Sequence, residues 1–593
     1  MLTGKQPVAR LQGLRSARIG AQRRQQGAIA LLAAIWLSIA IAALGAIDIG
    51  NLFFVRRDLQ RAADLAASAA AQTIGSAGGC AAATASAQGS ATANGLPATG
   101  TVVTTCGRWD PSANPGGSYF VSGNSPLSTP LNAAQVTVSQ SVPYFFFGPA
   151  RALSATATAQ ATNIGAFSLT TSLAQLSGGA INGLLNSLLG TSLSLSVASY
   201  QGLAATQVTL QNLAVALGVG SISELLNAKV TVGQLATALL VAAGQGTALS
   251  ASVSTALGTI VAAIPPGTQI SISSILSLGL GDPQAGASAS IGVLDALIVA
   301  AEVANGSSTI DLGAALNLGP IATVSAQAKV IEPPIIAVGE AGLYPNGKPR
   351  TTAHSAQVRV YLNIQLLQLN LGIVSISALS LPIYIEAANG TAYLQSTQCS
   401  TSKATSQSVV VARAGVATIC VGNDAAGNLT NTSTTTSCLQ PVPISHINVL
   451  GIPLLGAAVG DPSQTPPTGL LLQLQAPQST TLTFNAVVGD GDDYQSTNVN
   501  AVGGAVNGIL TQVVSQLATS VYVTVLGIPL IGSNSLLSPL LSGVLGIVAT
   551  LLSPVLNSLD AILVPLLQVL GVQIGVSTVH DLGLACGVPQ LVY

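Results

Sequence analysis

Six cysteines are the residues whose chemistry is easiest to assign in this chain of 593 residues. They are Cys80, Cys106, Cys399, Cys420, Cys438 and Cys586. No two of them have the Cys-x2-Cys spacing of a structural zinc site, so disulfide bonds are the better interpretation. Six cysteines allow 15 complete pairings. Cys80–Cys106 is the favoured pair because it is local and lies within one predicted domain, and the other pairings stay open.

Residues that could act in acid–base or metal chemistry are few and scattered. The three histidines, His354, His446 and His580, are isolated from one another, which is typical of structural histidines. The chain has no Gly-x-Ser-x-Gly, His-Glu-x-x-His or phosphate-loop motif. Residues 489–493 (Gly-Asp-Gly-Asp-Asp) offer carboxylates, which calcium prefers, but lack the register of a calcium loop and favour an acidic turn. We therefore predict no enzyme activity, no cofactor, no metal site and no small-molecule substrate.

The composition is unusual for a soluble globular protein. Apolar residues make up 49% of the chain and charged residues only 6%, whereas soluble domains carry about 25% charged residues. This length is also more than one hydrophobic core usually serves, so several packing units are expected. Low charge with many aliphatic residues is typical of a protein that lies beside a membrane or within an assembly.

The basic residues are concentrated at the start of the chain. Six of them lie within residues 1–26, where there is no acidic residue, and no Lys or Arg follows Arg413. A nucleic-acid-binding protein needs basic side chains spread over its binding face to neutralise phosphates. The distribution therefore excludes nucleic acid as an expected partner.

Residues 27–47 form an uncharged apolar segment of the length that a membrane-spanning helix needs. The basic cluster that precedes it predicts a cytoplasmic N-terminal tail (1–26) and an extracytoplasmic location for the rest of the chain. In such an oxidising compartment the disulfide bonds would persist. Two alternatives are a signal peptide cleaved near residues 43–45 and a buried core helix.

The helix is expected to continue beyond the membrane to about residue 74. Residues 48–72 are rich in helix-forming residues and contain no proline, and their apolar residues recur at helical spacing. The glycines at 75 and 78–79 are plausible ends. Small residues such as Ala42 and Gly45 would allow close helix–helix contact within the bilayer, although alanine also simply favours helix.

A block of residues in this segment resembles the TadE/TadG-like family of Flp pilus-assembly proteins. The residues that carry the resemblance are Asp48, Gly50, Arg57, Leu59, Gln60, Ala62, Ala63 and Asp64. It implies a bacterial inner-membrane protein with a structural or scaffolding role, whose partners are the membrane and other pilus-assembly or secretion proteins. Pilins that are processed at a glycine usually carry Glu five residues into the mature chain, and that position after Gly27 is Leu32 here, so an uncleaved component is expected. The alternative is a secreted or surface adhesin-like protein released by N-terminal cleavage.

The expected fold is α+β: an outward-extended transmembrane helix, a small pilin-like α+β domain and a large mixed β-rich and α-helical extracytoplasmic region. The predicted divisions are 1–26, 27–47, 48–164, 165–330 (mixed α/β) and 331–593 (β-rich with apolar C-terminal helices). Within the small domain, residues 76–98 are expected to form a loop, and four strands follow near 99–109, 118–122, 134–147 and 150–163. A repeated Val-Leu-Gly-Ile-Pro-Leu sequence (449–454 and 525–530) indicates repeated packing.

Overall fold

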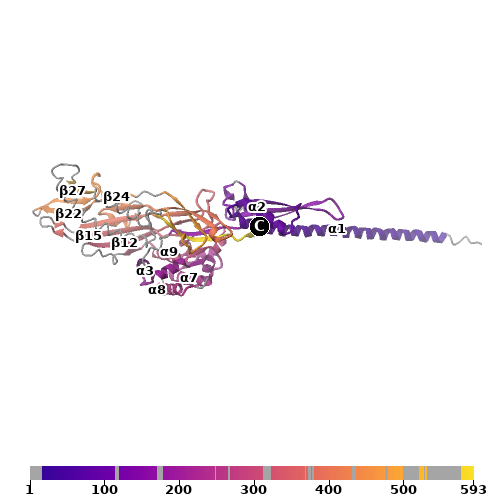
Figure 1. Cartoon of the computed structure of the whole chain (residues 1–593), viewed down its shortest axis with the longest axis horizontal. Coiled ribbons are helices and arrows are strands. Elements are labelled where there is room, and N and C mark those ends of the chain that lie inside the picture. Colours follow the sequence, from indigo (N-terminus) through magenta and orange to yellow (C-terminus); the bar gives the residue numbers. More distant parts are fainter. Residues whose placement is uncertain are drawn as a thin grey trace, which may run out of the picture.

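A single long helix, α1 (Ser16–Ile74), dominates one end of the computed structural model, and strand-rich layers occupy the other end (Figure 1). The structure describes the following residues: 16–113, 119–123, 125–169, 178–246, 249–264, 267–306, 308–311, 322–366, 369–370, 375–376, 379–430, 436–449, 452–473, 478–497, 520–525, 528–529 and 576–592. The apolar C-terminal helices that the sequence predicts near 536–570 lie outside this set.

α1 has two halves with opposite surroundings. From residue 27 to residue 47 nearly every side chain is exposed, including Trp36 at 68%. From Leu59 onward a stripe of small residues is buried at helical spacing, as a stripe that faces a core requires. Within the described residues, Gly27–Ile74 is the one helix long and apolar enough to cross a membrane. The expected long apolar N-terminal helix is thus confirmed.

The buried stripe of α1 packs on a five-stranded antiparallel sheet, here called the first sheet, whose strand order is β2-β1-β3-β4-β30. Its strands are β1 (Thr101–Trp109), β2 (Phe120–Ser122), β3 (Ala133–Val142), β4 (Arg151–Gln160) and β30 (Gln590–Val592). The core between them consists mainly of alanine and valine. Small side chains let the helix lie close to the sheet.

The prediction of a loop at 76–98 is wrong. Most of that segment is helix α2 (Gly79–Ala93), in which Ala83, Ala87 and Ala91 are fully buried one turn apart against α1 and the first sheet. The Ala/Gly/Ser/Thr composition of residues 76–98 is typical of a loose segment, but it also suits a closely packed helix. Alanine has the highest helix propensity, and a helix of small residues can pack tightly on another helix.

A helical layer follows the first sheet in the sequence and lies to one side of the strand layers (Figure 1). Its helices are α3 (Gly178–Leu189), α4 (Val197–Ala205), α5 (Leu210–Ala216), α6 (Ile222–Asn227), α7 (Val232–Gly246), α8 (Ala251–Ala263) and α9 (Val293–Asn305). Side-chain oxygens of Ser196, Thr209, Ser221 and Ser250 accept N–H groups at four N-termini. Two short strand pairs support this layer: β6 (Gln207–Thr209) with β10 (Ser290–Gly292), and β7 (Lys229–Val230) with β8 (Ile270–Ser271). A further short pair, β16 (Leu369–Asn370) with β17 (Ser375–Ile376), lies away from it and contacts β22 (Val442–Val449).

The strand-rich part contains four larger sheets. One has the order β11 (Thr309–Asp311), β12 (Ala322–Glu332), β15 (Gln357–Leu366), β18 (Leu379–Ala387), β21 (Ala417–Val421), β24 (Leu470–Gln473). A second has β26 (Tyr494–Ser496), β29 (Thr578–Ala585), β5 (Ile164–Leu169), β13 (Ile336–Gly339), β9 (Leu276–Gly279). A third has β14 (Thr352–His354), β19 (Thr391–Gln398), β20 (Gln407–Arg413), β25 (Thr480–Asn485), and the short α10 (Ala425–Asn428) contacts β18.

The fourth sheet, at the far end from α1, contains both copies of the repeated sequence. Its order is β22 (Val442–Val449), β23 (Ile452–Val459), β27 (Val521–Val525), β28 (Ile528–Pro529). Val449 pairs with Ile452 and Val525 pairs with Ile528, so each copy spans the corner of a hairpin. The two hairpins are neighbours, because Leu455 pairs with Val525. The repeat therefore corresponds to repeated local structure within one sheet.

The C-terminal residues return to the first sheet. β30 pairs with β4 at the edge of the first sheet opposite β2, and it also contacts α1. A disulfide bond between Cys399 and Cys586 fixes the segment just before β30 to the end of β19. The first sheet is therefore completed by a strand from the opposite end of the chain, and the bond keeps that strand's approach to the sheet fixed to β19.

A buried cluster of four charged side chains joins the first sheet to the strand-rich part. Arg108 in β1 lies 3.0 Å from the Asp110 carboxylate and 2.5 Å from that of Glu340, which follows β13. Arg350 lies within 4.0 Å of both carboxylates. All four side chains are at most 7% exposed. Burial by itself would lower the pKa of Arg108, but Glu340 and Asp110 outweigh it and raise that pKa. The two carboxylates therefore stabilise the charged form of Arg108.

Replacing Arg108 with methionine should destabilise the protein strongly, because it leaves buried carboxylates without their main counter-charge. Removing one partner of a buried ion pair typically costs about 3–5 kcal/mol. Arg61→Met is the matched control, since Arg61 forms an exposed ion pair with Asp58, and such pairs contribute at most about 1 kcal/mol. Thermal unfolding of the full chain in detergent measures both. Equal unfolding temperatures for the two variants would contradict the role assigned to the cluster.

Candidate functional site

The junction between the exposed and buried halves of α1 is the most distinctive site near the predicted membrane. Asp48 is only 2% exposed, although its neighbours Ile47 and Ile49 are 52% and 55% exposed. Its Oδ1 accepts the backbone N–H of Phe145 at 2.7 Å, and its Oδ2 accepts those of Phe146 at 3.2 Å and Phe147 at 2.9 Å. One carboxylate therefore satisfies three consecutive backbone donors.

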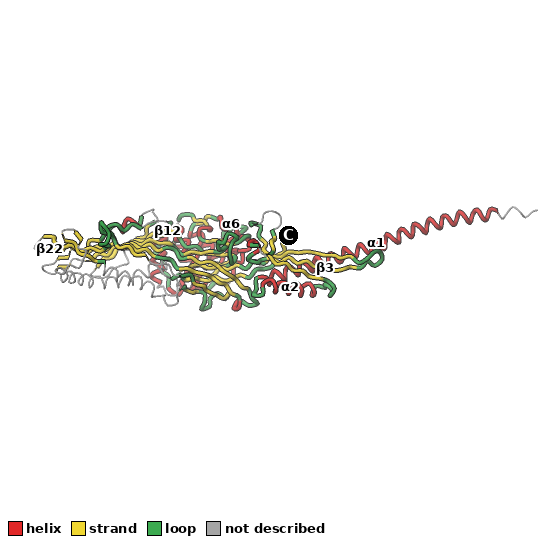
Figure 2. Tube along the Cα trace, turned by 90° about the horizontal axis from the view of Figure 1, so that it is seen from above, coloured by secondary structure: helices red, strands yellow, loops and turns green. Residues whose placement is uncertain are grey.

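Those donors lie at the tip of the hairpin between β3 and β4, which extends along α1 toward its N-terminal half (Figure 2). Pro143 and Pro149 bracket the tip, and Gly148 adopts a φ of 108°, which favours glycine. The three phenylalanine side chains offer no acceptor for their own backbone N–H groups. A carboxylate on the adjacent helix supplies both oxygens that these donors need, and an asparagine would supply one.

The other family-like residues divide between two faces of α1. Leu59, Ala62 and Ala63 are buried, at 3% exposure or less. Gln60 donates to the Asp64 carboxylate at 2.7 Å and to the backbone oxygen of Thr156 in β4 at 3.4 Å. Most of the motif therefore attaches the first sheet to the helix.

Gly50 and Arg57 belong to the second face. Arg57 is exposed, and an added Cβ at Gly50 would meet no atom within 4 Å. Neither residue contributes to the contact with the first sheet. Packing within the described residues therefore does not explain why these positions are Gly50 and Arg57. No described element covers this face of the helix at these two residues.

All six cysteines form disulfide bonds. Cys80 pairs with Cys106, Cys399 with Cys586, and Cys420 with Cys438. The first bond is the predicted local pair within the small domain, and it ties the first turn of α2 to β1. The expected disulfide-bonded character of the chain is confirmed.

The histidines take part in structural contacts. His580 Nδ1 lies 2.9 Å from the Asp295 carboxylate, and its ring stacks on Tyr494 with centroids 4.1 Å apart. The Ser168 hydroxyl also donates to Asp295, at 3.5 Å, so the carboxylate lies between serine and histidine. A hydrolytic triad instead needs histidine between the other two. His354, near Glu332 at 3.6 Å, is isolated, and His446 lies in β22 with its surroundings outside the described set.

The carboxyl group next to His580 is held in an unusual environment. Asp581 is 2% exposed and accepts the Ser408 hydroxyl at 3.0 Å. Burial raises the pKa of Asp581 to about 7, although Ser408 and His580 oppose the rise. This group therefore titrates near neutral pH without belonging to any catalytic arrangement in the described residues.

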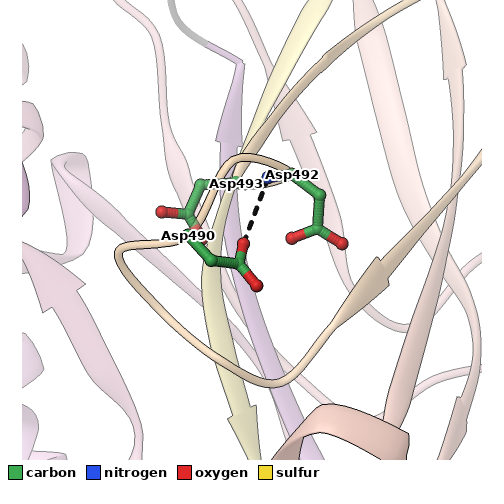
Figure 3. Close-up of side chains that lie close together, drawn as sticks. All are labelled: Asp490, Asp492 and Asp493. Atoms are coloured by element: carbon green, nitrogen blue, oxygen red, sulfur yellow. Dashed lines mark hydrogen bonds between the residues drawn. The ribbon is translucent and has the colours of Figure 1, made fainter.

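The acidic turn brings three carboxylates together between β25 and β26 (Figure 3). Candidate ligand oxygens of Asp490, Asp492 and Asp493 lie within 4.8 Å of one another. Several of these oxygens accept hydrogen bonds from within the turn: Asp490 from the N–H of Asp492 at 3.1 Å, and Asp493 from that of Gly489 at 2.8 Å. The geometry is that of an acidic turn stabilised by its own amides, and we assign no ion to it.

Three protein families match parts of the chain. Residues 27–73 match a family described as TadE/G-like Flp pilus assembly, and residues 68–162 match a Tad-like Flp pilus-assembly family. Residues 177–304 match a domain family of unknown function. No curated protein and no solved structure matches the chain. The first two matches cover the long helix, α2 and four strands of the first sheet, and these families are structural.

Asp48→Ala should loosen the hairpin tip, because three backbone N–H groups lose their acceptor. Hydrogen bonds to a charged group contribute about 1.5–3 kcal/mol each. Hydrogen exchange at Phe145, Phe146 and Phe147 should therefore become about ten-fold faster or more, as local opening becomes easier. Asp58→Ala, which alters an exposed carboxylate on the same helix, should leave these rates unchanged. Unchanged rates in Asp48→Ala would refute the capping role.

The Asp581 pKa leads to a prediction about pH. Since the folded-state pKa of about 7 exceeds the ordinary value of 3.8, unfolding releases a proton, and the contribution of Asp581 to stability is lost as pH rises through this window. The slope is at most about 1.4 kcal/mol per pH unit. Asp581→Asn mimics the protonated group and should remove this component. The variant should be more stable than the parent at pH 8 and similar to it at pH 4, in denaturant titrations at both values. A difference that does not depend on pH would show that Asp581 titrates normally.

Proposed function

We propose that this chain is a membrane-anchored structural component of a Flp-type pilus-assembly or secretion apparatus, because residues 27–73 and 68–162 match Flp pilus-assembly families. Residues 1–26 would lie in the cytoplasm, residues 27–47 would cross the inner membrane, and the remainder would be extracytoplasmic. Its partners would be the membrane and other components of the apparatus.

The observation that carries the proposal is the continuity of α1. Its exposed apolar half has the length of a membrane span, about 30 Å at 1.5 Å per residue. Its buried half is the central element of the first domain's core. A chain that needed only attachment to a membrane could use a flexible linker. Here the anchor and the outer domain share one helix, so force or orientation can pass directly between them.

Orientation is supported by two independent features. Six basic residues precede the span and three follow it within α1, which favours a cytoplasmic N-terminus. The three disulfide bonds all lie after the span, and such bonds persist in oxidising compartments. Both features favour an extracytoplasmic location for everything after Asp48.

A scaffolding role fits the way the described part of the chain uses its reactive side chains. The charges of Arg108 and Glu340 compensate each other at a buried junction. His580 and Asp295 pair within the core. One surface open to partners is the face of α1 that carries the exposed side chains of Arg56 and Arg57.

Reporter fusions test the topology. A reporter active only outside the cytoplasm, fused after Gly95 in the turn before β1 and separately after Gly460, should be active at both positions. A reporter active only in the cytoplasm should be inactive at both. If the first reporter is inactive at both sites, the proposed orientation is wrong, and inactivity at Gly460 alone would require a further crossing of the membrane.

The mass of the cellular protein separates a permanent anchor from release by cleavage. We expect an intact segment 1–26 and complete retention in the membrane fraction. A mature protein that begins near Gly45 would retain Asp48 and the whole first sheet but lose the span. Recovery of that form outside the cell would favour a secreted, adhesin-like protein and would refute the anchored scaffold.

A further inference from the structure

Five phenylalanines form an exposed group around the junction of α1 with the hairpin tip. Phe53 and Phe54 on α1 are 69% and 66% exposed, and Phe145, Phe146 and Phe147 on the tip are 63%, 51% and 42% exposed. They are five of the eight phenylalanines in a chain with only 3% aromatic residues. We call these five residues the phenylalanine cluster. Its concentration at one level of the molecule requires a partner that accepts apolar rings.

Asp48 sets the position of this cluster along α1 relative to the apolar span. The backbone of Phe145–Phe147 bonds to Asp48, which directly follows the apolar span 27–47. Phe53 and Phe54 lie five and six residues farther along α1, about 8–9 Å at 1.5 Å per residue. The span is just long enough for the hydrocarbon core. The cluster is therefore at the height of the lipid headgroup region when α1 crosses a bilayer.

The tip is also prepared for an apolar environment. An unpaired backbone N–H costs several kcal/mol when it leaves water, which normally keeps loops out of membranes. Asp48 satisfies the N–H groups of Phe145, Phe146 and Phe147, so these residues can approach lipid without that penalty. Basic residues that could meet lipid phosphates flank the cluster: Arg56 and Arg57 on α1 and Arg151 at the start of β4 are all exposed.

We propose that the phenylalanine cluster inserts into the interfacial region of the outer leaflet, so that the β3–β4 hairpin tip is a second membrane contact beside the α1 span. Aromatic side chains favour that region of a bilayer. Two contacts fix the tilt and rotation of the first sheet relative to the membrane, whereas a span alone leaves rotation free. This inference rests on the proposed membrane anchor.

Lipid is favoured over a protein partner by the chemistry of the tip. Phe145, Phe146 and Phe147 are its exposed aromatic side chains, and they bring apolar surface without a hydrogen-bonding group, while Tyr144 beside them is partly buried. The cluster is also continuous with Ile47 and Ile49, exposed residues at the end of the span. An apolar surface that adjoins a membrane-spanning segment is expected to contact the same bilayer.

Tryptophan quenching by brominated lipids tests the insertion. The chain has two tryptophans, Trp36 in the span and Trp109 in β1. In a Trp36→Phe background, Phe146→Trp places a reporter in the cluster, and Leu439→Trp, at a site 68% exposed in the strand-rich part, is the matched control. The full chain is reconstituted in phosphatidylcholine–phosphatidylglycerol vesicles, with or without bromine near the top of the acyl chains.

The Phe146→Trp protein should lose several-fold more emission to brominated lipid than the Leu439→Trp protein, and its spectrum should shift to the blue. Equal, small losses at the two sites would overturn the insertion. A photo-crosslinker placed at position 146 gives a second test in cells. If it captures an envelope protein and the vesicle experiment shows no quenching, the cluster is a protein interface and the proposed insertion is overturned. The parent chain, which keeps Trp36, distinguishes failure of the membrane anchor from failure of the cluster to insert. Lipids brominated deep in the bilayer should quench Trp36, and absence of that quenching would refute the span itself.

Discussion

The carboxylate of Asp48 fixes the geometry on which the rest of the molecule near the membrane depends. A helix as long as α1 sets a direction but leaves open where along it the outer domain is held. The three N–H groups that Asp48 accepts set that position at the first residue after the apolar span. The rise per residue of the helix then sets how far the hairpin, its sheet and the exposed phenylalanines lie from the end of the span.

The first sheet needs ties of this kind because its core is built from small side chains. Alanine buries little apolar area, and the hydrophobic contribution scales with area, so each alanine contact stabilises weakly. Long-range constraints make up for this: Cys80–Cys106 within the domain, Cys399–Cys586 and β30 from the far end of the chain, and the Arg108 cluster at the junction. In return, small residues allow α1, α2 and the sheet to lie close together in a slender part of the molecule that continues into the exposed half of α1 (Figures 1 and 2).

The elements with strong local signals could be predicted from the sequence, and contacts between distant residues could not. The span, the helix to residue 74 and the hairpin strands follow from apolar length and alternation. The loop assigned to α2 failed because small-residue composition describes both a loose segment and a tightly packed helix. Asp48 was recognised as part of a motif, but its partners are backbone N–H groups 97 to 99 residues away, and backbone donors leave no mark in a sequence. Nor could pattern reveal that Arg108 meets Glu340, or that Cys399 is joined to Cys586.

The central claim is that the membrane span and the first sheet move as one rigid body. The most direct measurement is the distance between spin labels at Ile41, within the span, and Val103, in β1, both exposed positions. The three disulfide bonds leave no free cysteine, so two introduced cysteines can be labelled selectively. In reconstituted bilayers the account predicts a single, narrow distance distribution. A broad or two-peaked distribution would mean that α1 bends between the labels, at Gly45 or Gly50, and would contradict the rigid coupling.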